Sequence, residues 1–89
     1  MTIKRDLPLV SCIMPTKDRR PFARRAIELF QRQDYPNREL VIVDDGKDRI
    51  ADLVGGDDRI RYVPLDRRLT LGAKRNLACQ HARGSLIAH

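Results

Sequence analysis

Two short apolar segments, each ended by polar or turn-forming residues, constrain the fold of this chain more than any other feature. Residues 9–15 (LVSCIMP) and residues 39–44 (ELVIVD) are nearly continuous runs rich in β-branched and aliphatic side chains. Such runs are typical of strands buried on both faces of a parallel sheet, because half-exposed strands alternate apolar and polar residues. Weaker runs at residues 60–65 and 85–89 predict two further strands.

The segments between these strands have the apolar spacing of helices. The pattern predicts a helix over residues 21–33, a short helix over residues 48–54 and a longer helix over residues 71–83. Strands that alternate with helices are typical of right-handed parallel crossovers. We therefore predict an α/β fold, a parallel Rossmann-like sheet with flanking helices, in one domain over residues 1–89.

The charge balance favours an anionic partner without selecting one. The chain has 18 Lys and Arg against 12 Asp and Glu, a formal net charge of +6. A nucleotide diphosphate, a nucleic acid or an acidic lipid would each suit this charge. The densest basic run is interpreted as a solvated helix face. Its members are Lys17, Arg19, Arg20, Arg24 and Arg25.

A small basic nucleic-acid-binding module is the alternative function that this charge permits. Modules of this kind stack bases on aromatic side chains, and this chain has only four aromatic residues. We place Phe22 and Phe30 in the apolar core of the first helix rather than on a base-binding surface. We therefore expect no nucleic acid as partner.

The two cysteines indicate the compartment. Cys12 and Cys79 lie in apolar stretches and have no partners at metal-ligand spacing, so we predict buried free thiols. Reduced thiols favour a cytoplasmic location. No run approaches the length of a membrane span, although a longer protein that contains this chain could still be membrane-associated.

Polar residues gather where the predicted strands end, which is where open parallel sheets bind ligands. The candidate binding residues are Pro15, Thr16, Asp18, Asp44, Asp45, Lys74, Arg75 and Asn76. Each has a structural alternative: Asp18 could cap the first helix, and Asp45 with Gly46 is an ordinary turn signal. Lys74 and Arg75 oppose the helix dipole, so a bound anion would offset their placement.

Three blocks in order give this chain a family resemblance. VSCIMPTKDR, QDYPNRELVIVDDG and GAKRNLACQHARGSLIAH together resemble the amino-terminal half of the inverting family 2 glycosyltransferases with the GT-A fold. The resemblance implies a partial GT-A fold that binds a nucleotide diphosphate sugar donor. The parent enzyme would transfer the sugar to an acceptor hydroxyl, whose identity the sequence does not reveal.

The resemblance also implies roles for the candidate residues. Pro15 and Thr16, with Asp18, would hold the base, and Asp45 would accept a hydrogen bond from a uracil ring, which suggests a uridine donor. Asp44 would orient its loop. Lys74 and Arg75 would approach the diphosphate, and the position of Asn76 is characteristic of the family.

Other functions of such enzymes fall outside the 89 residues. The family's Asp-rich motif for Mg²⁺ or Mn²⁺, its general base and its acceptor site are all expected beyond His89. We therefore assign no catalytic residue and no metal ligand, and expect this fragment to be inactive. An incomplete sheet is expected to leave an open edge and to self-associate.

Two other classes of α/β protein fit less well. A dinucleotide-binding domain needs glycines in its first turn, but residues 15–20 (PTKDRR) contain none. A phosphate-accepting receiver domain has its acidic pair after the first strand, whereas Asp44 and Asp45 follow the second.

Overall fold

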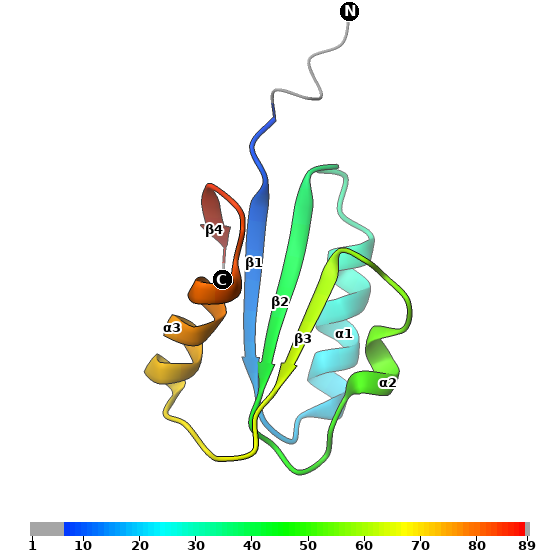
Figure 1. Cartoon of the computed structure of the whole chain (residues 1–89). Coiled ribbons are helices and arrows are strands. Elements are labelled where there is room, and N and C mark those ends of the chain that lie inside the picture. The colour runs from blue at the N-terminus through cyan, green and yellow to red at the C-terminus, as the bar shows by residue number, and fades with distance from the viewer. Residues whose placement is uncertain (1–6, 89) are drawn as a thin grey trace, which may run out of the picture.

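A computed structural model describes residues 7–88 as a four-stranded sheet with helices on both faces (Figure 1). The elements in chain order are β1 (Val10–Thr16), α1 (Arg20–Gln31), β2 (Arg38–Asp44), α2 (Ala51–Val54), β3 (Ile60–Pro64), α3 (Leu71–His81) and β4 (Leu86–Ala88). The strands lie in the order β3-β2-β1-β4, and every neighbouring pair is parallel. The predicted Rossmann-like α/β fold is confirmed.

The strand order reverses at β1, and this reversal decides which helix covers which face. The chain moves outward from β1 through β2 to β3, then returns to place β4 on the other side of β1. Because crossovers between parallel strands are right-handed, α1 and α2 lie on one face of the sheet and α3 lies on the opposite face (Figure 1).

β2 is the centre of the core, and all seven of its residues are buried. Alternate side chains point to opposite faces. Leu40 and Ile42 pack into the cluster formed with α1, while Val41 and Val43 pack into the cluster that contains Ala78 of α3. The continuous apolar sequence of this strand therefore reflects burial on two sides.

α1 buries one stripe of its surface, and Phe22 lies outside it. Ala23, Ile27 and Phe30 are buried at helical spacing. Phe22 is 70% exposed, so its predicted place in the core is wrong. One residue corresponds to about 100° of rotation around a helix, which turns Phe22 away from the stripe that begins at Ala23.

The two cysteines differ in burial. Both are free, but Cys79 is exposed and Cys12 is half-buried, so the prediction of two buried thiols is wrong for Cys79. Cys79 follows Ala78, which faces the sheet, and is therefore turned away from it. Burial raises the pKa of the Cys12 thiol despite the opposing effect of the Arg38 charge.

A polar cluster joins the end of α3 to the start of the sheet. Ser11 Oγ donates to Glu39 Oε2 at 2.6 Å and accepts from the Gly84 backbone N–H at 2.8 Å. The Arg83 N–H donates to the same Glu39 oxygen at 2.7 Å. A Cβ on Gly84 would lie 2.5 Å from both Leu9 O and Ser11 Oγ, so this close approach requires glycine.

Ile42→Val tests the central place of β2 in the core. Ile42 is fully buried, and removal of one methylene is expected to lower the free energy of unfolding by about 1 kcal/mol. Urea unfolding followed by circular dichroism measures the change. Leu71→Ala removes more apolar atoms, but at an exposed position, and should lower the free energy of unfolding less than Ile42→Val does. The reverse ranking would contradict the assigned core.

Candidate functional site

A pocket of about 480 Å³ opens at the carboxyl end of β1. It is lined by Pro15, Thr16, Lys17, Arg19, Leu71 and Lys74. These residues come from the last two positions of β1, the β1–α1 connection and the first turn of α3, at the lower end of the sheet in Figure 1. Three of them are cationic and none is acidic, so the lining favours an anionic ligand.

The two adjacent carboxylates at the end of β2 face opposite sides of the sheet. Asp44 continues the side of Leu40 and Ile42, and Asp45 lies on the side of α3. This follows from the alternation of side chains along an extended backbone. The two carboxylates therefore have separate partners.

Asp45 forms a buried ion pair with Lys74. Its Oδ1 is 2.9 Å from Lys74 Nζ, and its Oδ2 accepts from the Leu69 N–H at 2.8 Å. The two side chains are only 1% and 9% exposed. Burial alone would raise the pKa of Asp45, but the Leu69 N–H and the Lys74 ammonium outweigh it and lower the pKa below its usual value.

Lys74 keeps hydrogen-bonding capacity toward the pocket. An ammonium has three N–H donors, and Asp45 is its one hydrogen-bond partner within residues 7–88. Asp45, by contrast, is only 1% exposed, both of its oxygens already accept from internal donors, and it is not among the residues that line the pocket. The structure therefore offers Lys74 to a ligand more readily than Asp45.

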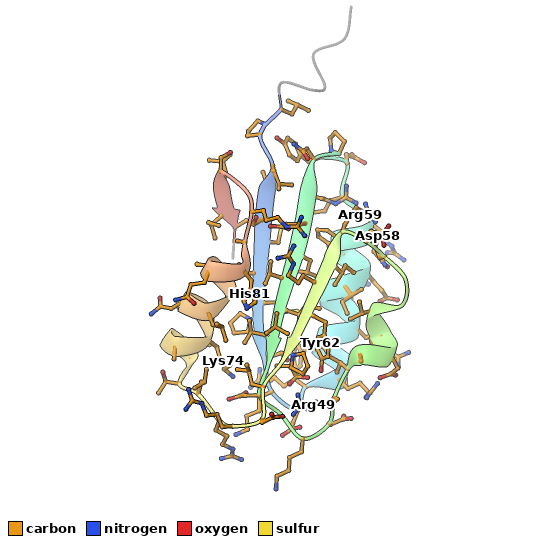
Figure 2. The ribbon with its side chains drawn as sticks, in the orientation of Figure 1. Arg49, Asp58, Arg59, Tyr62, Lys74 and His81 are labelled. Carbon is orange, nitrogen blue, oxygen red and sulfur yellow. The ribbon has the colours of Figure 1, made fainter. Side chains whose placement is uncertain are left out.

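Asp44 organises the connection that follows β2. Its Oδ1 accepts from the Gly46 N–H at 2.9 Å, and its Oδ2 accepts from the Tyr62 hydroxyl at 2.6 Å. The Tyr62 oxygen also accepts from the Ile50 N–H at 3.1 Å. Burial, and then the hydrogen bond to Asp44, raise the pKa of Tyr62. Tyr62 and Lys74 both lie toward the lower half of Figure 2.

Asp18 does not cap α1, contrary to one of its predicted roles. The N-cap residue is Arg19, whose side chain makes no capping hydrogen bond. Asp18 instead adopts a left-handed backbone conformation with φ of 50°, and its Oδ1 accepts from the Asp48 N–H at 2.7 Å. Its carboxylate is thus directed to the β2–α2 connection.

The structure brings together only part of the predicted site. Pro15, Thr16 and Lys74 line the pocket, whereas Arg75 and Asn76 are exposed on α3 and take no part in the lining.

Lys17, Arg19 and Leu71 also line the pocket, and none of the three is among the candidate binding residues named from the sequence. The interpretation of Lys17, Arg19 and Arg20 as part of a solvated helix face is wrong, because the first two precede α1 and Arg20 is held by acidic side chains. The position of Lys17 and Arg19 directly after β1 is the feature of the sequence that could have placed them at the pocket.

No metal centre is formed by the part of the chain that the structure describes. Residues 7–88 contain no group of three or more His, Cys, Asp or Glu residues placed to hold a metal ion. The carboxylates of Asp44 and Asp45 are both engaged by protein donors. The donor set of residues 7–88 therefore does not fit a divalent cation. Among the described helices, none has the length and apolarity required to cross a bilayer.

A parallel sheet with a pocket beyond the carboxyl ends of its strands, beside the strand where the order reverses, places this chain in the class of doubly wound α/β domains. The sequence matches the family described as Glycosyl transferase family 2 over residues 11–88. This chain belongs to that family, as the three sequence blocks predicted.

Individual relatives agree with the family. WcaA of Escherichia coli (strain K12), named as a glycosyl transferase for colanic acid biosynthesis, is 40% identical over 85 residues, which cover 90% of this chain and 30% of WcaA. A GalNAc(5)-diNAcBac-PP-undecaprenol beta-1,3-glucosyltransferase of Campylobacter jejuni is 34% identical over 61 residues, or 63% of this chain and 20% of that protein.

A solved structure supports the fold directly. The mannosyltransferase PcManGT of Pyrobaculum calidifontis, in complex with GDP-Man and Mn²⁺, superposes with a TM-score of 0.80 at 27% identity. The match covers 90% of this chain and 26% of the mannosyltransferase. The sheet therefore has the GT-A form of a Rossmann-like fold, and the chain spans less than a third of each of these proteins.

The buried ion pair predicts an acid-dependent loss of stability. Because the pKa of Asp45 is lowered on folding, the unfolded chain takes up the proton first, and this contribution is lost as the pH falls below about 4. Asp45→Asn leaves Lys74 buried without its charged partner and should lower the free energy of unfolding at pH 7 by about 3 kcal/mol. The difference in the free energy of unfolding between wild type and Asp45→Asn, measured by urea titration, should become smaller toward pH 2.

Asp34→Asn is the matched control for this experiment. Asp34 is exposed, so the same chemical change there should alter stability at pH 7 by less than about 0.5 kcal/mol. A difference between wild type and Asp45→Asn that stayed constant from pH 7 to pH 2 would contradict the assigned ion pair.

Proposed function

We propose that this chain forms the donor-binding part of a glycosyltransferase that moves a sugar from a nucleotide diphosphate to an acceptor hydroxyl. The observation that carries the proposal is the pocket at the carboxyl end of β1. Its lining combines the Thr16 hydroxyl with the cations of Lys17, Arg19 and Lys74. Hydroxyl and cationic groups in one pocket suit a ligand that has both a polar base and phosphates.

In this function Lys74 contacts the base of the nucleotide, and Asp45 orients the Lys74 ammonium. Neutralised by Asp45, the Lys74 ammonium attracts a phosphate less strongly than a free cation does, but it still donates hydrogen bonds. It would donate to a ring carbonyl of the base. Uracil has such carbonyls, whereas adenine has none. We therefore propose a uridine nucleotide as the donor.

Guanine also has a ring carbonyl, and the mannosyltransferase structure contains GDP-Man together with Mn²⁺. Both bases therefore belong in the test. A divalent cation bound with the donor would neutralise charge on its diphosphate. Because residues 7–88 do not provide its ligands, the proposal assigns to them recognition of the nucleotide alone.

Calorimetric titration with UDP, GDP and ADP tests the proposal. We expect UDP or GDP to bind at least about tenfold more tightly than ADP, because only uracil and guanine among these three bases present a carbonyl oxygen to the Lys74 ammonium. Lys74→Met should remove this selectivity, with circular dichroism confirming that the variant is folded.

Arg75→Met is the matched control, because it removes the same charge from the next position, where the side chain is exposed. It should retain the preference for UDP or GDP. Equal affinity of the wild-type chain for all three nucleotides, or no binding of any, would refute the proposed function.

We further propose that the isolated chain self-associates through its β4 edge. Leu86 and Ile87 are exposed, and within residues 7–88 β4 pairs with β1 alone. An unpaired apolar edge is a template for another strand. Sedimentation velocity at increasing concentration should show a species larger than the monomer, and Leu86→Lys should reduce it. A monomer at every concentration would contradict this proposal.

A further inference from the structure

Two of the pocket cations flank the one non-glycine residue with a left-handed backbone within residues 7–88. Lys17 and Arg19 both line the pocket, and Asp18 between them has φ of 50°. This conformation is unfavourable for L-amino acids, although Asp tolerates it better than most. A strained residue persists only where its surroundings hold it, and such residues cluster at ligand sites.

The β2–α2 connection holds Asp18 in this conformation. The Asp48 N–H donates to Asp18 Oδ1 at 2.7 Å. Gly46 packs directly against Asp18, so that a Cβ on Gly46 would lie 2.6 Å from Asp18 N and 2.7 Å from Asp18 Oδ1. The absence of a side chain at position 46 is therefore needed for the two connections to meet.

Arg20, the first residue of α1, binds the β2–α2 connection and α2. Its guanidinium donates to both oxygens of Asp48, at 3.2 Å and 2.9 Å, and to Asp52 Oδ2 at 2.8 Å. It also donates to Arg49 O at 2.6 Å. One exposed ion pair contributes little to stability, but a bidentate contact inside a network has defined geometry.

We propose that Arg20 is a positioning residue for the donor pocket. By holding Asp48 and Asp52, it fixes the left-handed turn at Asp18 and so presents Lys17 and Arg19 together to the diphosphate of the ligand. The inference rests on the proposed function, because it assumes a phosphate-bearing ligand. Arg20 itself does not line the pocket and acts through its neighbours.

The physical basis is preorganisation. Lys and Arg side chains on a free connection would have to be ordered when the ligand binds, and this ordering weakens affinity. A connection that is already held by Arg20 and Gly46 has lost much of that freedom before binding. The benefit should therefore concern the phosphates and leave recognition of the base unchanged.

Inorganic pyrophosphate is the probe, because it carries the charge of the diphosphate without a base or a sugar. Wild-type protein, Arg20→Gln and Arg25→Gln are titrated and followed by the amide NMR signals of residues 17–19. Arg25 is exposed on α1, and its side chain has no hydrogen bond or ion pair within residues 7–88. Both variants remove one positive charge, but only Arg20→Gln also removes contacts. We expect Arg20→Gln to weaken binding about fivefold or more and Arg25→Gln less than about twofold.

A second variant separates positioning from general electrostatics and leaves α1 unaltered. Asp48→Ala/Asp52→Ala makes the protein more positive, so long-range attraction alone predicts tighter pyrophosphate binding. Loss of the contacts with Arg20 predicts weaker binding. Weaker binding supports the inference, and tighter or unchanged binding overturns it, even if Arg20→Gln were to unfold.

The nucleotide titrations distinguish failure of this inference from failure of the proposed function. Uridine, which has no phosphate, should bind equally to wild type and Arg20→Gln. Equal losses for uridine and UDP would show a purely structural role for Arg20 and overturn the inference. Pyrophosphate binding that depends on Arg20, without any preference among UDP, GDP and ADP, would refute the proposed function and leave the positioning role supported. No pyrophosphate binding by wild type would overturn the inference.

Discussion

The buried ion pair between Asp45 and Lys74 connects the end of β2 to the first turns of α3. α3 lies on the face opposite α1, and its first turn supplies one wall of the pocket through Leu71 and Lys74. A buried carboxylate is stable when it is paired and hydrogen-bonded, and Asp45 has both the Lys74 ammonium and the Leu69 N–H as partners, while the remaining donors of Lys74 face the pocket. The pair thus fixes the position of α3 as well as the side chain offered to a ligand.

The neighbouring carboxylate of Asp44 serves the other face, so one strand end organises both sides of the sheet. Asp44 binds the Gly46 N–H and the Tyr62 hydroxyl, which shape the connection to α2. That connection in turn meets Asp18 at the close approach to Gly46. The segment Asp44-Asp45-Gly46 is therefore more than a turn signal. The two carboxylates have different partners, and glycine is required at position 46 because a Cβ there would collide with Asp18.

Most of the fold could be predicted from the sequence, because continuous apolar runs and helical periodicity are local signals. The run over residues 39–44 predicted the buried strand β2, and its polar end predicted the edge where the pocket lies. The placement of Phe22 and Cys79 failed because a shift of one residue on a helix changes exposure, and apolar character alone does not determine the helix face.

The site could be predicted only in part, because its geometry depends on contacts between distant segments. Thr16 and Lys74 were identified from their positions after a strand and at the start of a helix. The ion pair of Lys74 with Asp45 joins residues 29 positions apart, and the contacts of Arg20 with Asp48 and Asp52 join residues 28 and 32 positions apart. Basic residues of one run thus differ in role according to acidic partners that the local sequence does not reveal.

The reversal of strand order at β1 accounts for both the pocket and an apolar groove at a different place on the sheet. α1 and α2 belong to crossovers toward β3, while α3 belongs to the crossover from β3 back to β4, so the chain that leaves β1 and the start of α3 lie on different faces beside the carboxyl end of β1. The α1 face beside β1 is then only partly covered, and Cys12, Met14 and Leu29 line a groove of about 250 Å³ there. Right-handed crossovers that move in opposite directions along the sheet place their helices on opposite faces. The right-handedness of crossovers therefore accounts both for the polar pocket at the carboxyl end of β1 and for the apolar groove between β1 and α1.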